Sequence, residues 1–99
     1  MKLMTKEIES QMPKLYETEN IKNKMAMVKY FNPCGAQTWY GIEYDKEDRL
    51  FYGYVDFYGD GFGEYGYFSL DELESVKLPF GLGIERDLYF NPTPMSNIK

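Results

Sequence analysis

The sequence contains no histidine and only one cysteine, Cys34. Without histidine, the chain lacks the side chain that most often serves as general base and as nitrogen ligand to metals. One cysteine cannot form an internal disulfide, and it cannot supply the several ligands of a zinc site. Cys34 lies in the turn-like segment NPCG at 32–35. We interpret it as a small turn residue, because no base accompanies it that would make its thiol a nucleophile.

Long apolar runs are also missing. No segment reaches the roughly 18 consecutive apolar residues of a membrane-spanning helix, and the opening MKLMTKEIESQM lacks the apolar region of a signal peptide. We therefore expect a cytoplasmic protein that does not interact with membranes.

Basic residues are outnumbered. The chain has 16 acidic and 11 basic residues, and its net charge is −5. This balance disfavours a general nucleic-acid binder, because such proteins gain affinity from Lys and Arg that displace counterions from phosphates. It is compatible with a partner protein that has a basic surface, or with a charge that only maintains solubility.

The remaining composition is that of one globular domain. The 99 residues are 43% hydrophobic and 27% charged, which is atypical of disorder, and we expect one domain over 1–99 with a loosely held tail at 92–99. Aromatic residues make up 18%. Because each large ring buries roughly 150–250 Å², they let a short chain build a core.

Two short helices are predicted from end signals. Thr5 can cap a helix over 5–12. Ser69 and Glu72 have the spacing of a capping box, which predicts a second helix over 70–77. Both are too short to be stable alone, so we expect them to pack on a sheet.

Four strands are predicted from alternating patterns bounded by turn residues. Their ranges are 25–32, 37–44, 50–57 and 64–68. The short connections favour a mostly antiparallel meander, so the expected fold class is α+β with a four-stranded sheet. The segment IERDLYF at 84–90 fits either a strand or a helical turn.

The stretch FYGYVDFYGDGFGEYGYF at 51–68 is half Phe and Tyr and contains no Lys or Arg. Within it, 61–66 match G-x-G-x-x-G, but a strand overlaps the motif where a nucleotide-binding site needs a helix start. A calcium loop beginning at Asp56 fails because Tyr occupies required ligand positions. A weak site made of Asp56, Asp60 and Glu64 is left as an alternative. We assign no catalytic, cofactor-binding or metal-ligating residue.

Strand alternation separates the aromatic residues into two sets. Residues of the first set are expected in the core: Phe51, Val55, Phe57 and Phe68. Residues of the second set are expected on one shared face: Tyr40, Tyr52, Tyr54, Tyr65 and Tyr67. On the strand 37–44, the same alternation puts Tyr40, Ile42 and Tyr44 opposite Trp39, Gly41 and Glu43.

Several roles fit the tyrosines. They can pack beneath the helices, or contact a partner protein, since Tyr gives contact area at low entropic cost. They can also stack on single-stranded nucleic acid, which would need Lys29, Lys46 or Arg49 nearby. An enzyme with paired carboxylates is a further alternative, although no pair is marked. We expect non-enzymatic protein binding, through Tyr40, Tyr52, Tyr54, Asp60, Glu64, Tyr65 and Tyr67.

The motifs TWY, GYFSLDELE and GLGIERDLYF, spread over most of the chain, resemble a bacterial domain-of-unknown-function family. That family is common on plasmids, integrative elements and phage-like regions. The resemblance implies a small cytosolic α+β protein of mobile elements and supplies no catalytic residues. It makes the partner a host or element-encoded protein, for example a defence or nucleic-acid-handling protein that the chain inhibits. An adaptor or a plasmid-maintenance factor fits equally.

Overall fold

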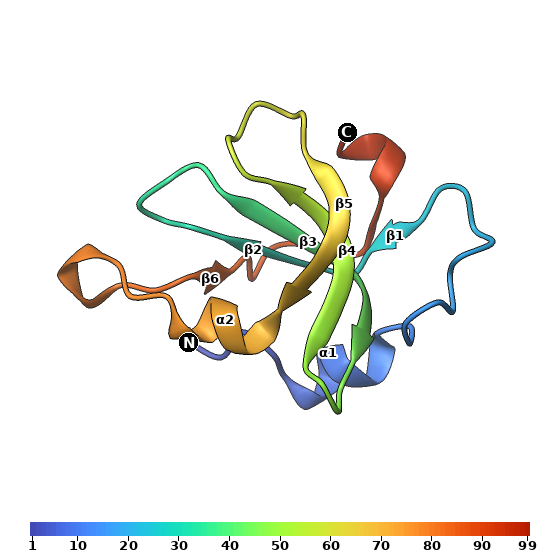
Figure 1. Ribbon diagram of the computed structural model, residues 1–99, viewed down its shortest axis with the longest axis horizontal. Coiled ribbons are helices and arrows are strands. Elements are labelled where there is room, and N and C mark those ends of the chain that lie inside the picture. The colour runs from blue at the N-terminus through green and yellow to red at the C-terminus, as the bar shows by residue number, and fades with distance from the viewer.

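The computed structural model describes residues 1–99 and has an α+β fold. A five-stranded antiparallel sheet has the order β5-β4-β3-β2-β6, and β1 and β7 form a separate two-stranded sheet (Figure 1). The elements are α1 (Lys6–Gln11), β1 (Met25–Ala26), β2 (Val28–Phe31), β3 (Thr38–Asp45), β4 (Leu50–Asp56), β5 (Glu64–Ser69), α2 (Leu70–Ser75), η1 (Pro79–Gly81), β6 (Glu85–Arg86), β7 (Thr93–Pro94) and η2 (Met95–Asn97).

The prediction of four strands in one sheet was wrong. The segment 25–32 divides at Met27, so that β1 pairs with β7 while β2 pairs with β3 and β6. The ambiguous segment 84–90 contributes β6, a two-residue strand opposite Tyr30 and Phe31. Such short pairings are stabilised by contacts between distant parts of the chain, so local patterns do not reveal them.

Both helices begin where the capping residues indicate. Thr5 Oγ1 accepts a hydrogen bond from the Ile8 amide at 3.1 Å, and Ser69 Oγ accepts one from the Glu72 amide at 3.2 Å. The second helix ends at Ser75, two residues earlier than expected. Neither helix has the length and apolar character needed to cross a membrane.

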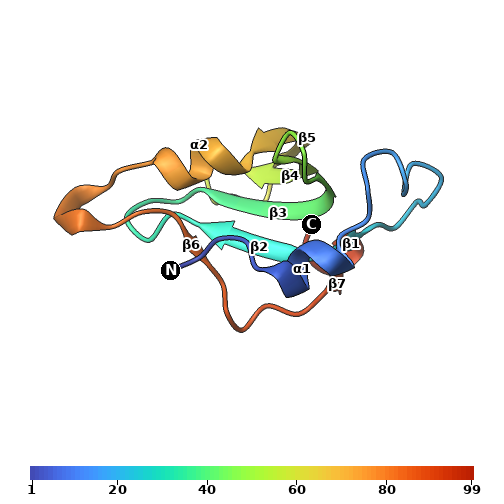
Figure 2. The same ribbon diagram turned by 90° about the horizontal axis from the view of Figure 1, so that it is seen from below.

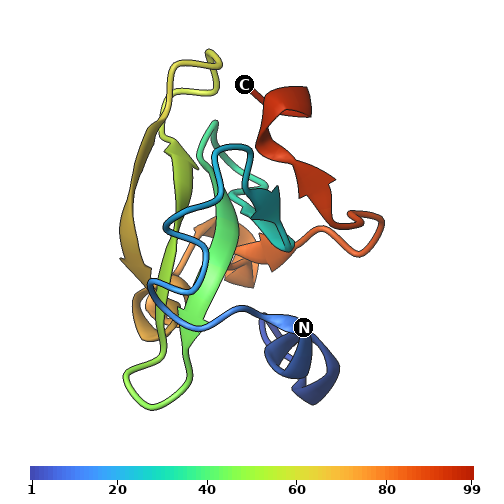
Figure 3. The ribbon, with the colours of Figure 1, turned by 90° about the vertical axis from the view of Figure 1, so that its right-hand side faces the viewer.

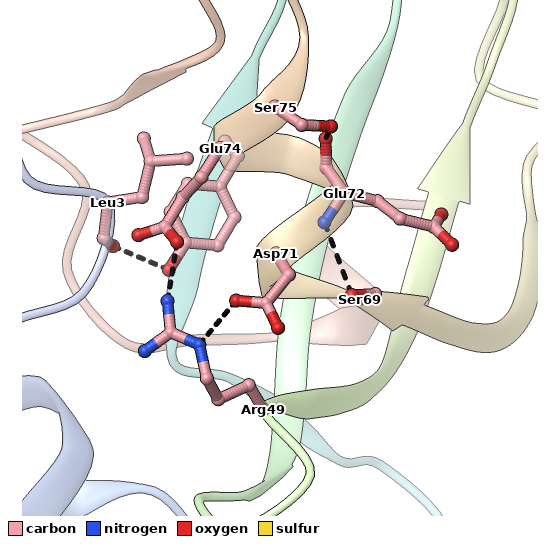
Figure 4. A network of polar contacts seen from close by, with 8 residues as sticks. Leu3, Arg49, Ser69, Asp71, Glu72, Glu74 and Ser75 are labelled. Carbon is pink, nitrogen blue, oxygen red and sulfur yellow. Dashed lines mark hydrogen bonds and ion pairs between the residues drawn. The ribbon is translucent and has the colours of Figure 1, made fainter.

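Arg49 fastens α2 to the turn between β3 and β4. Its Nε donates to Asp71 at 2.6 Å and its Nη2 donates to Glu74 at 2.5 Å (Figure 4). Its carbonyl oxygen also accepts a hydrogen bond from the Leu70 amide at 2.9 Å, at the helix start. The ion pairs are exposed, so solvent weakens them, but the bonds together fix the orientation of α2.

One face of the sheet carries the main core. The N-terminal segment, α1 and α2 pack on this face, and both helices lie near the same end of the sheet (Figures 1 and 2). Phe51 and Phe68 are buried there as a stacked pair with ring centres 4.9 Å apart. They lie beside a cross-strand row of Gly41, Gly53 and Gly66. A side chain at Gly41 would meet the Phe51 ring and one at Gly53 would crowd the Phe68 ring, so these two glycines leave room for the rings.

Phe57 is a correction to the predicted core. Its side chain is 55% exposed, because β4 ends at Asp56 and the chain turns into the loop 57–63. Phe51, Val55 and Phe68 do pack in the main core, as expected.

The other face carries a smaller cluster in which the C-terminal segment takes part. We expected 92–99 to be a loosely held tail, but Thr93 and Pro94 pair with β1, and Met95 is buried. The Met95 amide donates to the Lys24 carbonyl oxygen at 2.8 Å. Figure 3 shows this segment beside β1. The cluster comprises Ala26, Ile42, Tyr54 and Met95, with Tyr40, Tyr52, Phe90 and Ile98 around it.

A β-bulge in β3 changes the predicted sides of two residues, Glu43 and Tyr44. Gly41 pairs with Gly53 and Glu43 with Tyr52, which leaves Ile42 as the extra residue. Beyond the bulge, Glu43 shares a face with Tyr52, while Tyr44 contacts Phe51 in the main core. The expectations that Tyr44 lies on the side of Tyr40 and that Glu43 lies opposite Tyr40 were therefore wrong.

Candidate functional site

Five tyrosines lie on one face of the sheet, which we call the tyrosine face: Tyr40, Tyr52, Tyr54, Tyr65 and Tyr67. The register pairs Tyr54 with both Tyr40 and Tyr65, and pairs Tyr52 with Tyr67. Directly paired residues project from the same side of a sheet, and alternate residues of one strand share a side. The register thus brings together the residues that alternation could assign only strand by strand.

The rings of this face contact one another across the strands. Tyr52 and Tyr67 meet edge to face with ring centres 5.3 Å apart, and Tyr54 and Tyr65 do so at 5.2 Å. Tyr52 also stacks with Tyr65 at 6.2 Å. Such cross-strand aromatic pairs stabilise the sheet and hold the rings in fixed orientations.

Burial decreases toward the sheet edge. Tyr54, on the inner strand β4, is buried, and Tyr40 and Tyr52 are half-buried. Tyr65 and Tyr67, on the edge strand β5, are 40% and 51% exposed. The covering residues come from the C-terminal part of the chain, including Phe90 and Met95 of η2, and not from α1 or α2. The exposed portion of the tyrosine face is thus along β5.

The two acidic residues predicted beside the tyrosines lie differently. Asp60 belongs to the loop 57–63, which is tied to this face because the Tyr54 hydroxyl accepts a hydrogen bond from the Gly63 amide at 2.8 Å. The Asp60 carboxylate accepts one from the Phe62 amide at 2.9 Å. Glu64 pairs with Val55, whose side chain packs against the main core, so Glu64 lies on the face opposite the tyrosines.

Glu43 is a buried acid of this face that the sequence reasoning missed. Its carboxylate accepts hydrogen bonds from the Tyr16 amide at 2.8 Å, from the Thr18 amide at 2.9 Å and from the Thr18 hydroxyl. These bonds fix the segment after α1 against the sheet and hold Tyr16, which has φ 70°. A non-glycine residue in this left-handed region is strained, so the surrounding bonds must maintain it.

The phenols of Tyr40, Tyr52 and Tyr65 have a raised pKa and remain neutral over a wide pH range. Burial raises the pKa of Tyr40, and the negative charges of Asp56 and Asp87 add to the effect. Burial likewise raises the pKa of Tyr52 and Tyr65. Neutral phenols can donate as well as accept hydrogen bonds, and their rings attract cations.

Two lysines of the chain already lie over rings of this face. Lys99 Nζ is 4.9 Å from the ring centre of Tyr65 and 5.8 Å from that of Tyr54. Lys29 Nζ is 5.7 Å from the ring centre of Tyr40, and it also pairs with Asp87 at 3.7 Å.

The other candidates from the sequence do not assemble into sites. Asp56 accepts hydrogen bonds from the amides of Gly59 and Gly61, and no cluster of three possible metal ligands includes it with Asp60 and Glu64. Asp71 and Glu74 approach each other, but Arg49 binds both. Cys34 is exposed in its turn. A hollow of about 650 Å³ beside α1 has a balanced charged lining that includes Lys6, Lys14, Lys46, Glu9, Asp45 and Glu47.

Comparison with known proteins identifies the family. The family described as "Protein of unknown function (DUF2958)" matches residues 3–98, and the chain belongs to it. No curated protein and no solved structure matches the chain.

Proposed function

We propose that this protein is a non-enzymatic binding module whose tyrosine face binds a partner protein with a basic surface. The observation that carries the proposal is the cross-strand register, which gathers five tyrosines on one face and leaves Tyr65 and Tyr67 exposed at its edge. Tyrosines held by their neighbours provide contact area with little further loss of conformational freedom, which favours binding.

Charge supports a basic partner. The chain carries net charge −5, and its own lysines already lie over rings of this face. The complementary surface on a partner would therefore present Lys or Arg, which speeds association and selects among partners. Within this proposal, the mobile-element setting implied by the sequence resemblance makes a host defence or nucleic-acid-handling protein the first class to test.

A capture experiment with the immobilised chain tests this function. We expect the double variant Tyr65→Ala/Tyr67→Ala to bind the captured host partner at least about tenfold more weakly, which corresponds to a loss of about 1.4 kcal/mol in binding free energy. Phe80→Ala is the control, because Phe80 is 96% exposed in η1, away from the tyrosine face. Unchanged binding by the double variant, with circular dichroism showing an intact fold, would rule out the proposed surface.

Single-stranded nucleic-acid binding is the second candidate, because Lys29 lies over the Tyr40 ring and Lys99 lies over the ring of Tyr65, which stacks on Tyr52. Two other basic residues were considered from the sequence. Arg49 forms ion pairs with Asp71 and Glu74, and Lys46 lines the hollow beside α1. A titration with oligonucleotides at about 50 mM salt separates the candidates, since electrostatic binding is strongest at low salt. Saturable binding that disappears in the double variant would favour nucleic acid over a protein partner.

A further inference from the structure

A hollow of about 240 Å³ lies beside the exposed edge of the tyrosine face. It is lined by Tyr16, Glu19, Lys24, Glu43, Tyr52 and Tyr67. We propose that this hollow binds the cationic side chain, ammonium or guanidinium, of a basic polypeptide. This inference rests on the proposed function, because it names the group by which the partner would be recognised.

The walls of the hollow are aromatic rings from separate parts of the chain. Tyr52 and Tyr67 come from neighbouring strands and meet edge to face, whereas Tyr16 comes from the segment after α1. Tyr16 and Tyr67 both line this space, so the segment after α1 and the edge strand β5 contribute to one hollow. Three rings around one space form the arrangement that attracts organic cations.

The hollow is built with a rigid base. Glu43 closes it from the sheet side, and its carboxylate fixes the Tyr16 and Thr18 amides. This bonding maintains Tyr16 at φ 70°, a strained conformation that positions its ring beside the opening. Pre-organised rings lose little freedom when a ligand enters, so more of the contact energy appears as affinity.

The charges of the lining favour a cation. The lining contains two carboxylates, those of Glu19 and Glu43, and one ammonium group, that of Lys24. Lys24 Nζ is occupied by the carbonyl oxygens of Thr18 and Ile21, at 2.5 and 2.7 Å. Glu19 is exposed and takes part in none of the chain's ion pairs. An entering cation would meet an acid at the rim as well as the rings.

The rest of the tyrosine face shows the same chemistry within the chain. The rings of Tyr40, Tyr54 and Tyr65 each have a lysine ammonium within 6 Å of the ring centre, whereas those of Tyr16, Tyr52 and Tyr67 have none. The hollow is thus the part of this aromatic surface where no lysine of the chain lies over a ring.

The test titrates the isolated full chain with small probes and follows its amide and tyrosine ring signals by NMR. The probes are the acetylated amides of arginine and lysine, and the neutral controls are those of citrulline and norleucine, which have similar shapes. We expect saturable shifts at Tyr16, Tyr52 and Tyr67 with either cationic probe, and at least about fivefold weaker binding of its neutral counterpart. Equal binding of charged and neutral probes, or shifts confined to other regions, would overturn the site.

Variants separate ring chemistry from folding. Tyr67→Ala should lower the affinity for the cationic probe at least about fivefold, whereas Tyr67→Phe should keep most of that affinity. Glu19→Gln should lower the affinity about twofold. Phe80→Ala should leave it unchanged. Retained binding in Tyr67→Ala would refute the proposal. The probe titration contains no partner protein, so it is independent of the capture experiment. If the cationic probes do not bind but capture still depends on Tyr65 and Tyr67, the hollow is wrong and the proposed function stands. If the probes bind in the hollow but capture does not depend on these tyrosines, the proposed function is wrong and the hollow stands.

Discussion

Replacing the buried Glu43 with alanine should destabilise the protein strongly. The substitution removes the acceptor for two backbone amides, those of Tyr16 and Thr18, and for the Thr18 hydroxyl. Thr18 is buried, so its two donors would lose their partner where water has little access, at about 1–3 kcal/mol each. The Tyr16 residue is exposed, so its amide can recover a bond to water. The sum for the two Thr18 donors predicts a loss of about 2–6 kcal/mol in the free energy of unfolding.

Graded variants test this origin of the effect. Glu43→Gln keeps one carbonyl oxygen but turns an amide group toward the donors, so it should cost about half as much as Glu43→Ala. Thr18→Val removes only the hydroxyl donor and should cost about 1 kcal/mol. Glu47→Ala is the control, since Glu47 is exposed in the turn between β3 and β4 and its loss should stay within about 0.5 kcal/mol.

Urea unfolding measured by circular dichroism and by fluorescence of the single tryptophan, Trp39, provides the free energies. Limited trypsin digestion adds a local readout, because a detached segment after α1 should be cleaved faster at Lys14 and Lys22 in Glu43→Ala. If Glu43→Ala loses less than about 1 kcal/mol, or no more than Glu47→Ala, the carboxylate does not hold this segment as the hydrogen bonds indicate.

Three further outcomes are expected. Gly53→Ala should lower the free energy of unfolding in urea by about 3 kcal/mol or more, because the new Cβ would lie 1.8 Å from the Tyr40 carbonyl oxygen. Gly66→Ala should be nearly neutral, because its Cβ would have no atom within 4 Å, and equal losses in the two variants would contradict this. Met95→Ala should cost about 2–5 kcal/mol and speed amide exchange in the C-terminal segment, and unchanged exchange would mean that Met95 does not anchor it. Burial raises the pKa of Tyr30 far above the ordinary value of about 10, so the folded chain retains a proton that the unfolded chain releases. The contribution of Tyr30 to stability should therefore be constant below about pH 10 and fall above it, which urea unfolding of the chain and of Tyr30→Phe at a series of pH values can show; an equal loss of stability above about pH 10 in both would contradict this.

Local signals in the sequence predicted the elements whose causes are local. Thr5 and Ser69 cap helices because their side chains bond to amides three residues away, an interaction contained within one short segment. The long strands β3, β4 and β5 likewise follow from alternation and from glycine-rich turns. Whether the tail 92–99 was bound could not be read in this way, because Met95 is apolar in a segment with no regular period, and its anchor is the distant strand β1.

The bulge in β3 shows why the candidate site was only partly predictable. Alternation alone assigns Glu43 and Tyr44 to faces by counting from Tyr40, and one extra residue at Ile42 reverses both. The sequence QTWYGIEY contains Gly41 next to the bulge, a residue often found at such irregularities, but glycines at Gly53 and Gly66 lie in regular pairing. The buried acid and the hollow above it therefore depend on a feature that only the strand register reveals.

Strand order explains why the tyrosines could be assigned to a face but not to core or surface. Tyr54 and Tyr65 are neighbours on the same side of the sheet, yet one is buried and the other is 40% exposed. Side chains on β4 have neighbouring strands on both sides, whereas those on β5 have one on a single side, because β5 is an edge strand. Identical residues with identical alternation thus serve packing at Tyr54 and are available for contact at Tyr65. On this face, the strand order and the covering C-terminal segment together decide which rings are buried, so one aromatic stretch supplies both buried and exposed rings.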